Sequence, residues 1–162
     1  MILSKNLNNS NLLIVGGTGF IGSNVAKKAL ENGFKVTVIS KNNYPQNKQI
    51  NCVDYINVDI SREKDLYHIL KDRVFEYVLN IVGYVDHKNF SEGGKEVFET
   101  HFSGTLNLVK SINKDFLTGF IQIGSSDEYG ANIAPPKENH REMPISPYSI
   151  ANTSATHFLQ MV

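Results

Sequence analysis

The sequence predicts an α/β fold of three layers, in which helices cover both faces of a doubly wound parallel β-sheet. Short apolar runs alternate with amphipathic stretches along the 162 residues, and glycines follow the first apolar run directly. Strands and helices that alternate in this way form a parallel sheet. Right-handed crossovers between the strands then give the order 3-2-1-4-5. The length suits a single domain over residues 1–162.

The first part of the chain predicts two strands separated by a helix. Residues 12–15 are apolar and lead into glycines, which is typical of a buried parallel strand. A helix is expected over residues 19–32, because apolar side chains recur on one face and Asn32-Gly33 is a C-terminal stop signal. Residues 34–39 predict the second strand, and the polar residues 41–51 predict a surface loop.

The middle of the chain predicts another strand, a helix and the central strand. Residues 53–58 form the third apolar run, and Ser61 is the expected N-cap of a helix that ends near residue 72. Residues 75–82 are the most apolar segment, so we expect them to form a central strand. A turn over residues 90–94 follows.

Two helices and one strand complete the predicted fold. An apolar stripe from Val97 to Ile112 indicates a long helix, and residues 118–123 predict the fifth strand. A proline-rich connection over residues 134–147 leads to a last helix that begins near Tyr148. No repeat or low-complexity stretch interrupts the alternation of strands and helices.

The glycine-rich segment Gly16-Gly17-Thr18-Gly19-Phe20-Ile21-Gly22 lies between the first strand and the first helix. Gly16 permits a tight turn, Gly19 lets the backbone approach a pyrophosphate, and Gly22 lets the helix pack closely on the sheet. Free N–H groups at the start of the helix then face the phosphates. In this context the pattern predicts a Rossmann fold that binds NAD(H) or NADP(H). The alternative is a structural turn without a ligand.

The residues at the end of the second strand distinguish the two dinucleotides. An acidic side chain at this position accepts hydrogen bonds from the ribose 2′-hydroxyl and repels a 2′-phosphate. This sequence has Ser40-Lys41-Asn42 instead. Serine can donate a hydrogen bond to a phosphate and Lys41 supplies a positive charge, so the sequence favours NADP(H). The alternative is that Lys41 is a solvated loop lysine.

Composition argues against several other classes of function. Lys+Arg and Asp+Glu both total 16, so the formal net charge is zero, and the sequence lacks the basic excess that is typical of nucleic-acid-binding proteins. Cys52 is the single cysteine, which leaves no CxxC metal site and no internal disulfide. No signal segment and no apolar run of membrane-spanning length is present. We therefore expect a cytoplasmic protein without nucleic-acid or membrane partners.

A family resemblance rests on five segments that follow one another in a characteristic order. They are the glycine-rich turn, Val58-Asp59-Ile60, Ile81-Val82-Gly83, Ser125-Ser126 and Tyr148-Ser149-Ile150-Ala151-Asn152. Together they resemble the extended short-chain dehydrogenase/reductases, the NAD-dependent nucleotide-sugar epimerases and dehydratases, over essentially the whole chain. Residues 125–130 and Ser146-Pro147-Tyr148 are most similar to UDP-glucose 4-epimerase-like and dTDP-glucose or GDP-mannose dehydratase-like enzymes.

The resemblance implies specific contacts with the dinucleotide. Asp59 would accept a hydrogen bond from the adenine amino group, and Ile60 would flank the adenine ring. Ile81, Val82 and Gly83 would line the path of the adenine ribose and nicotinamide. The complete set of predicted cofactor-binding residues is Gly16, Thr18, Gly19, Phe20, Ile21, Gly22, Ser40, Lys41, Asp59, Ile60, Ile81, Val82, Gly83, Tyr148 and Asn152.

The resemblance also implies catalytic residues for the oxidation of a sugar hydroxyl. Tyr148 matches the catalytic base, and Ser125 matches the residue that donates to the substrate oxygen. Asp127 lies where some dehydratases place the acid used in water elimination; the alternative is a solvated loop carboxylate. A free tyrosine has a pKa of about 10. Members of the family lower it with a lysine four residues further along the helix, a position that is Asn152 in this chain.

The chain departs from the family pattern in three respects. Asn152 has no charge with which to stabilise a tyrosinate. His101 replaces an asparagine that is usual in relatives, and we expect it to be a packed helix histidine. The family also continues beyond the tyrosine helix into a substrate-binding part, which we expect this chain to lack because its sequence stops at Val162.

These departures leave more than one function open. The first hypothesis is an enzyme, or the cofactor half of one, that acts on a nucleotide-diphosphate sugar. The second is a catalytically inactive dinucleotide-binding module that serves as a sensor or scaffold, and the third is a non-redox nucleotide binder. The resemblance further implies a homodimer that packs the long helix over residues 97–112 and the tyrosine helix into a four-helix bundle. That arrangement would bury Phe98, Phe102 and Phe158.

Overall fold

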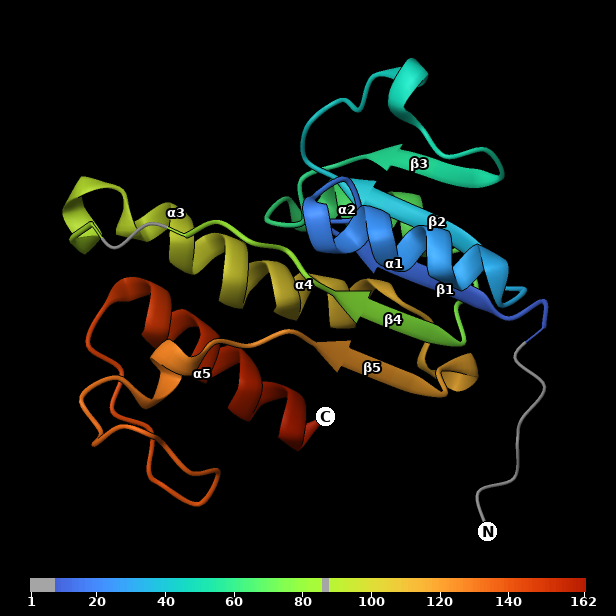
Figure 1. Cartoon of the computed structure of the whole chain (residues 1–162). Coiled ribbons are helices and arrows are strands. Elements are labelled where there is room, and N and C mark those ends of the chain that lie inside the picture. The colour runs from blue at the N-terminus through green and yellow to red at the C-terminus, as the bar shows by residue number, and fades with distance from the viewer. Residues whose placement is uncertain (1–7, 86–87) are drawn as a thin grey trace, which may run out of the picture.

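A computed structural model describes residues 8–85 and 88–162. Within these residues a parallel sheet of five strands has the order β3-β2-β1-β4-β5, as the sequence predicts. Figure 1 shows the sheet with helices on both of its faces. The strands are β1 (Asn11–Val15), β2 (Lys35–Ser40), β3 (Val53–Asn57), β4 (Tyr77–Asn80) and β5 (Gly119–Gln122).

The helices follow the predicted alternation with the strands. They are α1 (Phe20–Glu31), α2 (Glu63–Leu70), α3 (Gly94–Phe98), α4 (Gly104–Ser111) and α5 (Pro147–Met161). Short 3₁₀ turns are η1 (Gln46–Lys48), η2 (Phe90–Glu92), η4 (Lys114–Phe116) and η5 (Ser126–Tyr129). The predicted long helix is present, but the π-helical turn η3 (Glu99–Ser103) separates α3 from α4.

Strand β1 explains why helices must cover both faces of the sheet. Leu13 and Val15 pack into one apolar cluster with side chains of α2 and α4. Leu12 and Ile14 pack into a second cluster with side chains of α1. Because successive side chains of a strand point to opposite faces, this continuous apolar run requires cover on both sides.

One predicted helix start is wrong. Helix α2 begins at Glu63 with Arg62 at the N-cap, and no side chain caps it. Ser61 instead donates from its backbone N–H (3.0 Å) and its hydroxyl (2.8 Å) to Oδ1 of Asp59. Serine and aspartate readily form such local turns, which compete with helix capping.

Helix α5 lies beside the segment from α3 to α4 (Figure 1). Ser146 is its N-cap and accepts a hydrogen bond from the backbone N–H of Ser149, and Pro147 occupies the first helical position. These residues are strong helix-start signals, and they place Tyr148 in the first turn of the helix.

Candidate functional site

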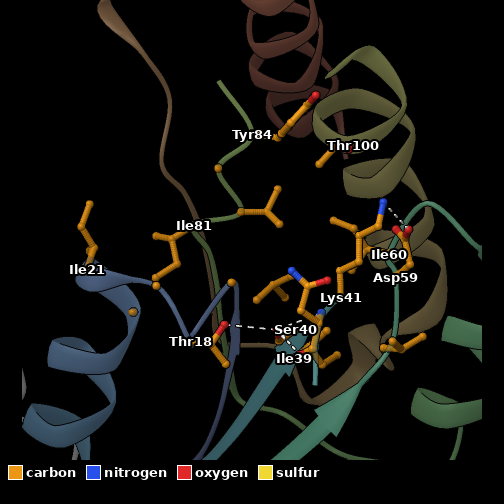
Figure 2. A pocket seen from close by; sticks show the side chains of 18 of the residues that line it. Thr18, Ile21, Ile39, Ser40, Lys41, Asp59, Ile60, Ile81, Tyr84 and Thr100 are labelled. Atoms are coloured by element: carbon orange, nitrogen blue, oxygen red, sulfur yellow. Dashed lines mark hydrogen bonds and ion pairs between the residues drawn. The ribbon is translucent and has the colours of Figure 1, made fainter. Parts of the chain in front are cut away.

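A cavity of about 610 Å³ lies where β1, β2 and β4 end (Figure 2). The strand order reverses at β1, which has β2 on one side and β4 on the other. In open α/β sheets, ligands usually bind at the carboxyl ends of the strands at such a point. Every predicted cofactor-binding residue except Tyr148 and Asn152 lines the cavity. The lining residues that were not predicted to bind the cofactor are Val15, Ile39, Asn42, Val58, Tyr84, Glu96 and Thr100.

Packing explains Gly16 and Gly22, two of the three glycines to which the sequence assigns a role in the turn. Gly16 has a φ of +84°, and a Cβ added to it would lie 2.9 Å from the carbonyl oxygen of Ile81. A Cβ on Gly22 would lie 2.5 Å from the Cα of Gly17. Both contacts are with backbone atoms that cannot swing aside, so the protein itself requires glycine at these two positions.

Gly19 is different, because the protein does not require it. It has an extended backbone (φ −74°, ψ 177°), and the nearest atom to an added Cβ is the carbonyl oxygen of Gly16 at 3.5 Å. A Cβ at Gly19 would therefore meet no close protein atom, and Gly19 lines the cavity. This bare stretch of backbone is compatible with the close approach of a pyrophosphate, and glycine is also a favoured residue at an N-cap.

The start of α1 is suited to an anion. Gly19 is its N-cap, no side chain caps the first turn, and no acidic residue lies in that turn. Phe20, Ile21 and Gly22 line the cavity from this end of the helix. Unpaired N–H groups at a helix N-terminus, together with the positive end of the helix dipole, attract phosphate groups.

Hydrogen bonds hold the end of β2 in place. The Ser40 hydroxyl accepts from the Thr18 hydroxyl (3.1 Å) and donates to the carbonyl of Asn42 (2.8 Å). The side-chain amide of Asn57 donates to the carbonyl oxygens of Ser40 (3.2 Å) and Lys41 (3.0 Å). The segment that the sequence associates with cofactor choice is thus fixed to both the glycine turn and β3.

An ion pair joins the ends of β2 and β3. The Lys41 ammonium lies 3.0 Å from Oδ2 of Asp59, and the contact is drawn as a dashed line in Figure 2. The Lys41 side chain remains 72% exposed, whereas that of Asp59 is 16% exposed. Burial alone would raise the pKa of Asp59, but hydrogen bonds from Ser61 and the nearby Lys41 outweigh it and lower the pKa. Asp59 is therefore a carboxylate at neutral pH.

The predicted catalytic serine is held by its own loop. The Ser125 hydroxyl accepts from the backbone N–H of Asp127 (3.2 Å), and the backbone N–H of Ser125 donates to Glu128 (2.8 Å). Glu128 is buried, and its other carboxylate oxygen accepts from the hydroxyl of Thr156 on α5 (2.8 Å). Sequence reasoning missed Glu128, which fastens the serine loop to the tyrosine helix; its capping-box spacing from Ser125 was the available signal.

Four predicted residues do not line the cavity: Tyr148, Asn152, Ser125 and Asp127. Asn152 is 2% exposed, and its side-chain amide donates to the carbonyl of Tyr148 (2.9 Å), so it is bound to its own helix. Tyr148 is half-buried and contacts the His101 ring, with 5.1 Å between ring centroids. His101 is 2% exposed, which confirms the expectation of a packed helix histidine.

The described residues contain neither a metal cluster nor a membrane-spanning helix. No group of three or more His, Cys, Asp and Glu side chains in this part of the chain could hold a metal ion. Likewise, none of the helices over residues 8–85 and 88–162 combines the length and apolar character needed to cross a membrane.

Known proteins with the same architecture carry nucleotide ligands. The UDP-glucose 4-epimerase of Thermotoga maritima, solved with UDP-glucose, is 28% identical and has a TM-score of 0.79 over 93% of this chain and 50% of its own. The Bordetella bronchiseptica enzyme WbmG, solved with NAD and UDP, is 21% identical and has a TM-score of 0.79 over 95% of this chain and 50% of its own.

Sequence comparison leads to the same group. The dTDP-D-glucose 4,6-dehydratase of Dictyostelium discoideum is 24% identical over an alignment 171 positions long, which covers 92% of this chain and 39% of the dehydratase. The chain spans about half the length, or less, of these relatives. The model of one family, described as the NAD dependent epimerase/dehydratase family, matches residues 12–162. That match covers nearly all of the chain, which therefore belongs to the NAD dependent epimerase/dehydratase family.

Proposed function

We propose that the chain is the dinucleotide-binding part of an enzyme that acts on a nucleotide-diphosphate sugar, and that it prefers NADP(H) to NAD(H). The observation that carries the proposal is the glycine turn at the start of α1, where Gly19 lines the cavity without a side chain and the first helical turn has neither a capping side chain nor an acidic residue. Relatives of the same fold support it, since WbmG was solved with NAD and UDP and the Thermotoga enzyme with UDP-glucose.

The residues around the cavity fit the parts of a dinucleotide. The pyrophosphate would lie over the turn from Gly16 to Gly22, where the start of α1 offers N–H groups. Asp59, ionised and only partly exposed, would accept a hydrogen bond from the adenine amino group. Ile60 and the segment from Ile81 to Gly83 supply apolar walls for the adenine and ribose.

The preference for NADP(H) rests on charge at the end of β2. Strand β2 ends at Ser40 without a carboxylate, and the exposed Lys41 follows it. A second hollow of about 530 Å³ shares Lys41 and Asp59 with the main cavity and is also lined by Arg62. Each cation is paired with a carboxylate of the same hollow, Lys41 with Asp59 and Arg62 with Asp65 (4.0 Å). A 2′-phosphate would compete with these carboxylates for the two cations through charge-assisted hydrogen bonds.

A nicotinamide dinucleotide held by the cavity residues would supply reversible hydride transfer for the oxidation of a sugar hydroxyl. Tyr148 would take the proton of the sugar hydroxyl, and Ser125 would donate a hydrogen bond to the same oxygen.

The geometry of Asn152 also favours a second candidate, a dinucleotide-binding module without turnover. Its buried amide binds the carbonyl of Tyr148 and brings no positive charge to the tyrosine. Activity on UDP-, dTDP- and GDP-sugars would favour the first candidate.

Calorimetric titration of the 162-residue chain with NADP⁺ and with NAD⁺ tests the proposal. We expect both dinucleotides to bind, with NADP⁺ about tenfold tighter, because one additional charge-assisted contact contributes about 1.5 kcal/mol. Absence of binding by either dinucleotide would refute the function. Equal affinities, or tighter NAD⁺, would refute only the preference assigned to Ser40 and Lys41.

Self-association through α5 and the segment from α3 to α4 belongs to the same proposal. Phe102 lies 5.4 Å from Phe98 and 6.3 Å from Phe158 between ring centroids, and all three rings are half-buried. A half-buried aromatic cluster on paired helices suits a dimer interface. Light scattering at micromolar concentration should therefore give about twice the mass of 18.1 kDa. A monomer mass would contradict the dimer.

A further inference from the structure

His101 lies at the point where the long helix departs from α-helical geometry. It belongs to the π-helical turn η3, which is continuous with α3 and α4. Such single π turns are rare and occur frequently at functional sites. The His101 side chain is 2% exposed, so its contacts are with other protein atoms and not with solvent.

The imidazole is fixed by the backbone of Tyr84. Nε2 of His101 lies 3.1 Å from the carbonyl oxygen of Tyr84 and 3.4 Å from its backbone nitrogen. Nε2 donates to the carbonyl in the tautomer that protonates it, and it accepts from the backbone N–H of Tyr84 in the other tautomer. In both tautomers Nδ1 is buried without a hydrogen-bond partner among the described residues. Burial also lowers the pKa of His101, which keeps the ring neutral at pH 7.

The same ring packs against Tyr148. The two ring centroids are 5.1 Å apart and the ring planes are at 89°, which is the edge-to-face geometry that aromatic pairs favour. Tyr84 lines the cavity and Tyr148 does not, so His101 joins the wall of the cavity to the tyrosine. On its other side Tyr148 has Asn152, whose amide is bound to the helix backbone.

We propose that His101 is a positioning residue for Tyr148: the imidazole ring of His101 sets the orientation of the Tyr148 phenol relative to the cavity. Being neutral, it acts through ring packing and its bond to Tyr84 and not through charge. The importance of this orientation for catalysis rests on the proposed function, which makes Tyr148 the base. The orientation itself is a property of the ligand-free chain and can be measured without cofactor or substrate.

NMR of the chain with ring-labelled tyrosine tests the proposal. The Tyr148 signals are those that Tyr148→Phe removes. In wild type we expect them to be displaced from their unfolded positions by the ring current of His101. His101→Phe should retain the displacement, because it keeps an aromatic ring, whereas His101→Asn and His101→Leu should lose it. Glu99→Gln, on the same π-helical turn but exposed, is the matched control and should leave the signals unchanged.

Amide spectra and thermal unfolding identify variants that remain folded, and His101→Leu serves if His101→Asn does not fold. In a uniformly labelled chain, the Hα–Hβ couplings of Tyr148 report its χ1 rotamer without any contribution from the ring current of His101. A changed rotamer in folded His101→Asn or His101→Leu, with the wild-type rotamer retained in His101→Phe, supports the proposal. An unchanged Tyr148 rotamer in a folded variant without the ring would overturn it, as would failure of His101→Phe to retain the wild-type rotamer. Dinucleotide titration of the same variants reports separately on the proposed function, so the two failures are distinguishable.

Discussion

Gly19→Ala should weaken dinucleotide binding about 100-fold, equivalent to about 2.7 kcal/mol, while the chain remains as stable as wild type. The added methyl group meets no protein atom closer than 3.5 Å, and the backbone of Gly19 is already in a conformation that alanine adopts. It would, however, occupy the side of the turn that lines the cavity, where a pyrophosphate needs bare backbone. Calorimetric titration and thermal unfolding measure the two effects.

Gly22→Ala is the matched comparison within the same turn. Its methyl group would lie 2.5 Å from the Cα of Gly17 and 2.7 Å from the carbonyl oxygen of Gly16. Such overpacking costs about 1–3 kcal/mol of stability. In Gly19→Ala the free energy of unfolding should change by less than about 1 kcal/mol. Alanine is a poorer N-cap than glycine, but it also makes the unfolded chain less flexible, and the two effects oppose each other. If Gly19→Ala bound NADP⁺ and NAD⁺ as wild type does, the turn would not be a phosphate site.

The fold could be predicted from the sequence because its signals are local and repeated. The apolar run at β1, the glycine turn and the stop at Asn32-Gly33 each specify one element, and Gly33 has the positive φ of +81° expected after a helix. Handedness then leaves few ways to order the parallel strands. The glycine turn, Ser40 and Lys41 were predicted from residue patterns, whereas Asp59, Ile60 and residues 81–83 were implied by the family resemblance; all of them line the cavity.

Other features depend on contacts between distant segments, which leave little trace in the sequence. Glu96 and Thr100 line the cavity because the long helix passes over the ends of the strands, and a helical stripe alone does not reveal this. The π-helical turn around His101 has no periodic signature. Ser61 resembles an N-cap, but Asp59 competes for its hydroxyl and its N–H.

The double variant Ser40→Asp/Lys41→Ala should reverse the cofactor preference, with a change of about 100-fold in the ratio of the dissociation constants of NADP⁺ and NAD⁺. A carboxylate at the end of β2 would accept hydrogen bonds from a ribose 2′-hydroxyl and repel a 2′-phosphate. Lys41→Ala removes a cation whose side chain is 72% exposed, so we expect it to contribute less to the change in this ratio than Ser40→Asp does.

The structure indicates that the fold tolerates this double change. The Ser40 hydroxyl accepts hydrogen bonds from the Thr18 hydroxyl and the Asn42 N–H, and a carboxylate can accept both. The variant loses only the bond that the hydroxyl donates to the exposed Asn42 carbonyl. Asn57 holds the backbone at this point through the carbonyl oxygens of Ser40 and Lys41, which the substitutions leave in place. Thermal unfolding of the ligand-free variant checks that the β2 end is intact.

Lys48→Ala provides the control for charge, because Lys48 is exposed in the same loop but does not line either hollow at the end of β2. It should leave both affinities within about threefold of wild type. Paired calorimetric titrations of wild type, the control and the double variant give the ratio directly. If the double variant kept the wild-type ratio, the 2′-position of the ribose would lie away from Ser40 and Lys41. If both affinities fell together, these residues would bind a group that the two dinucleotides share.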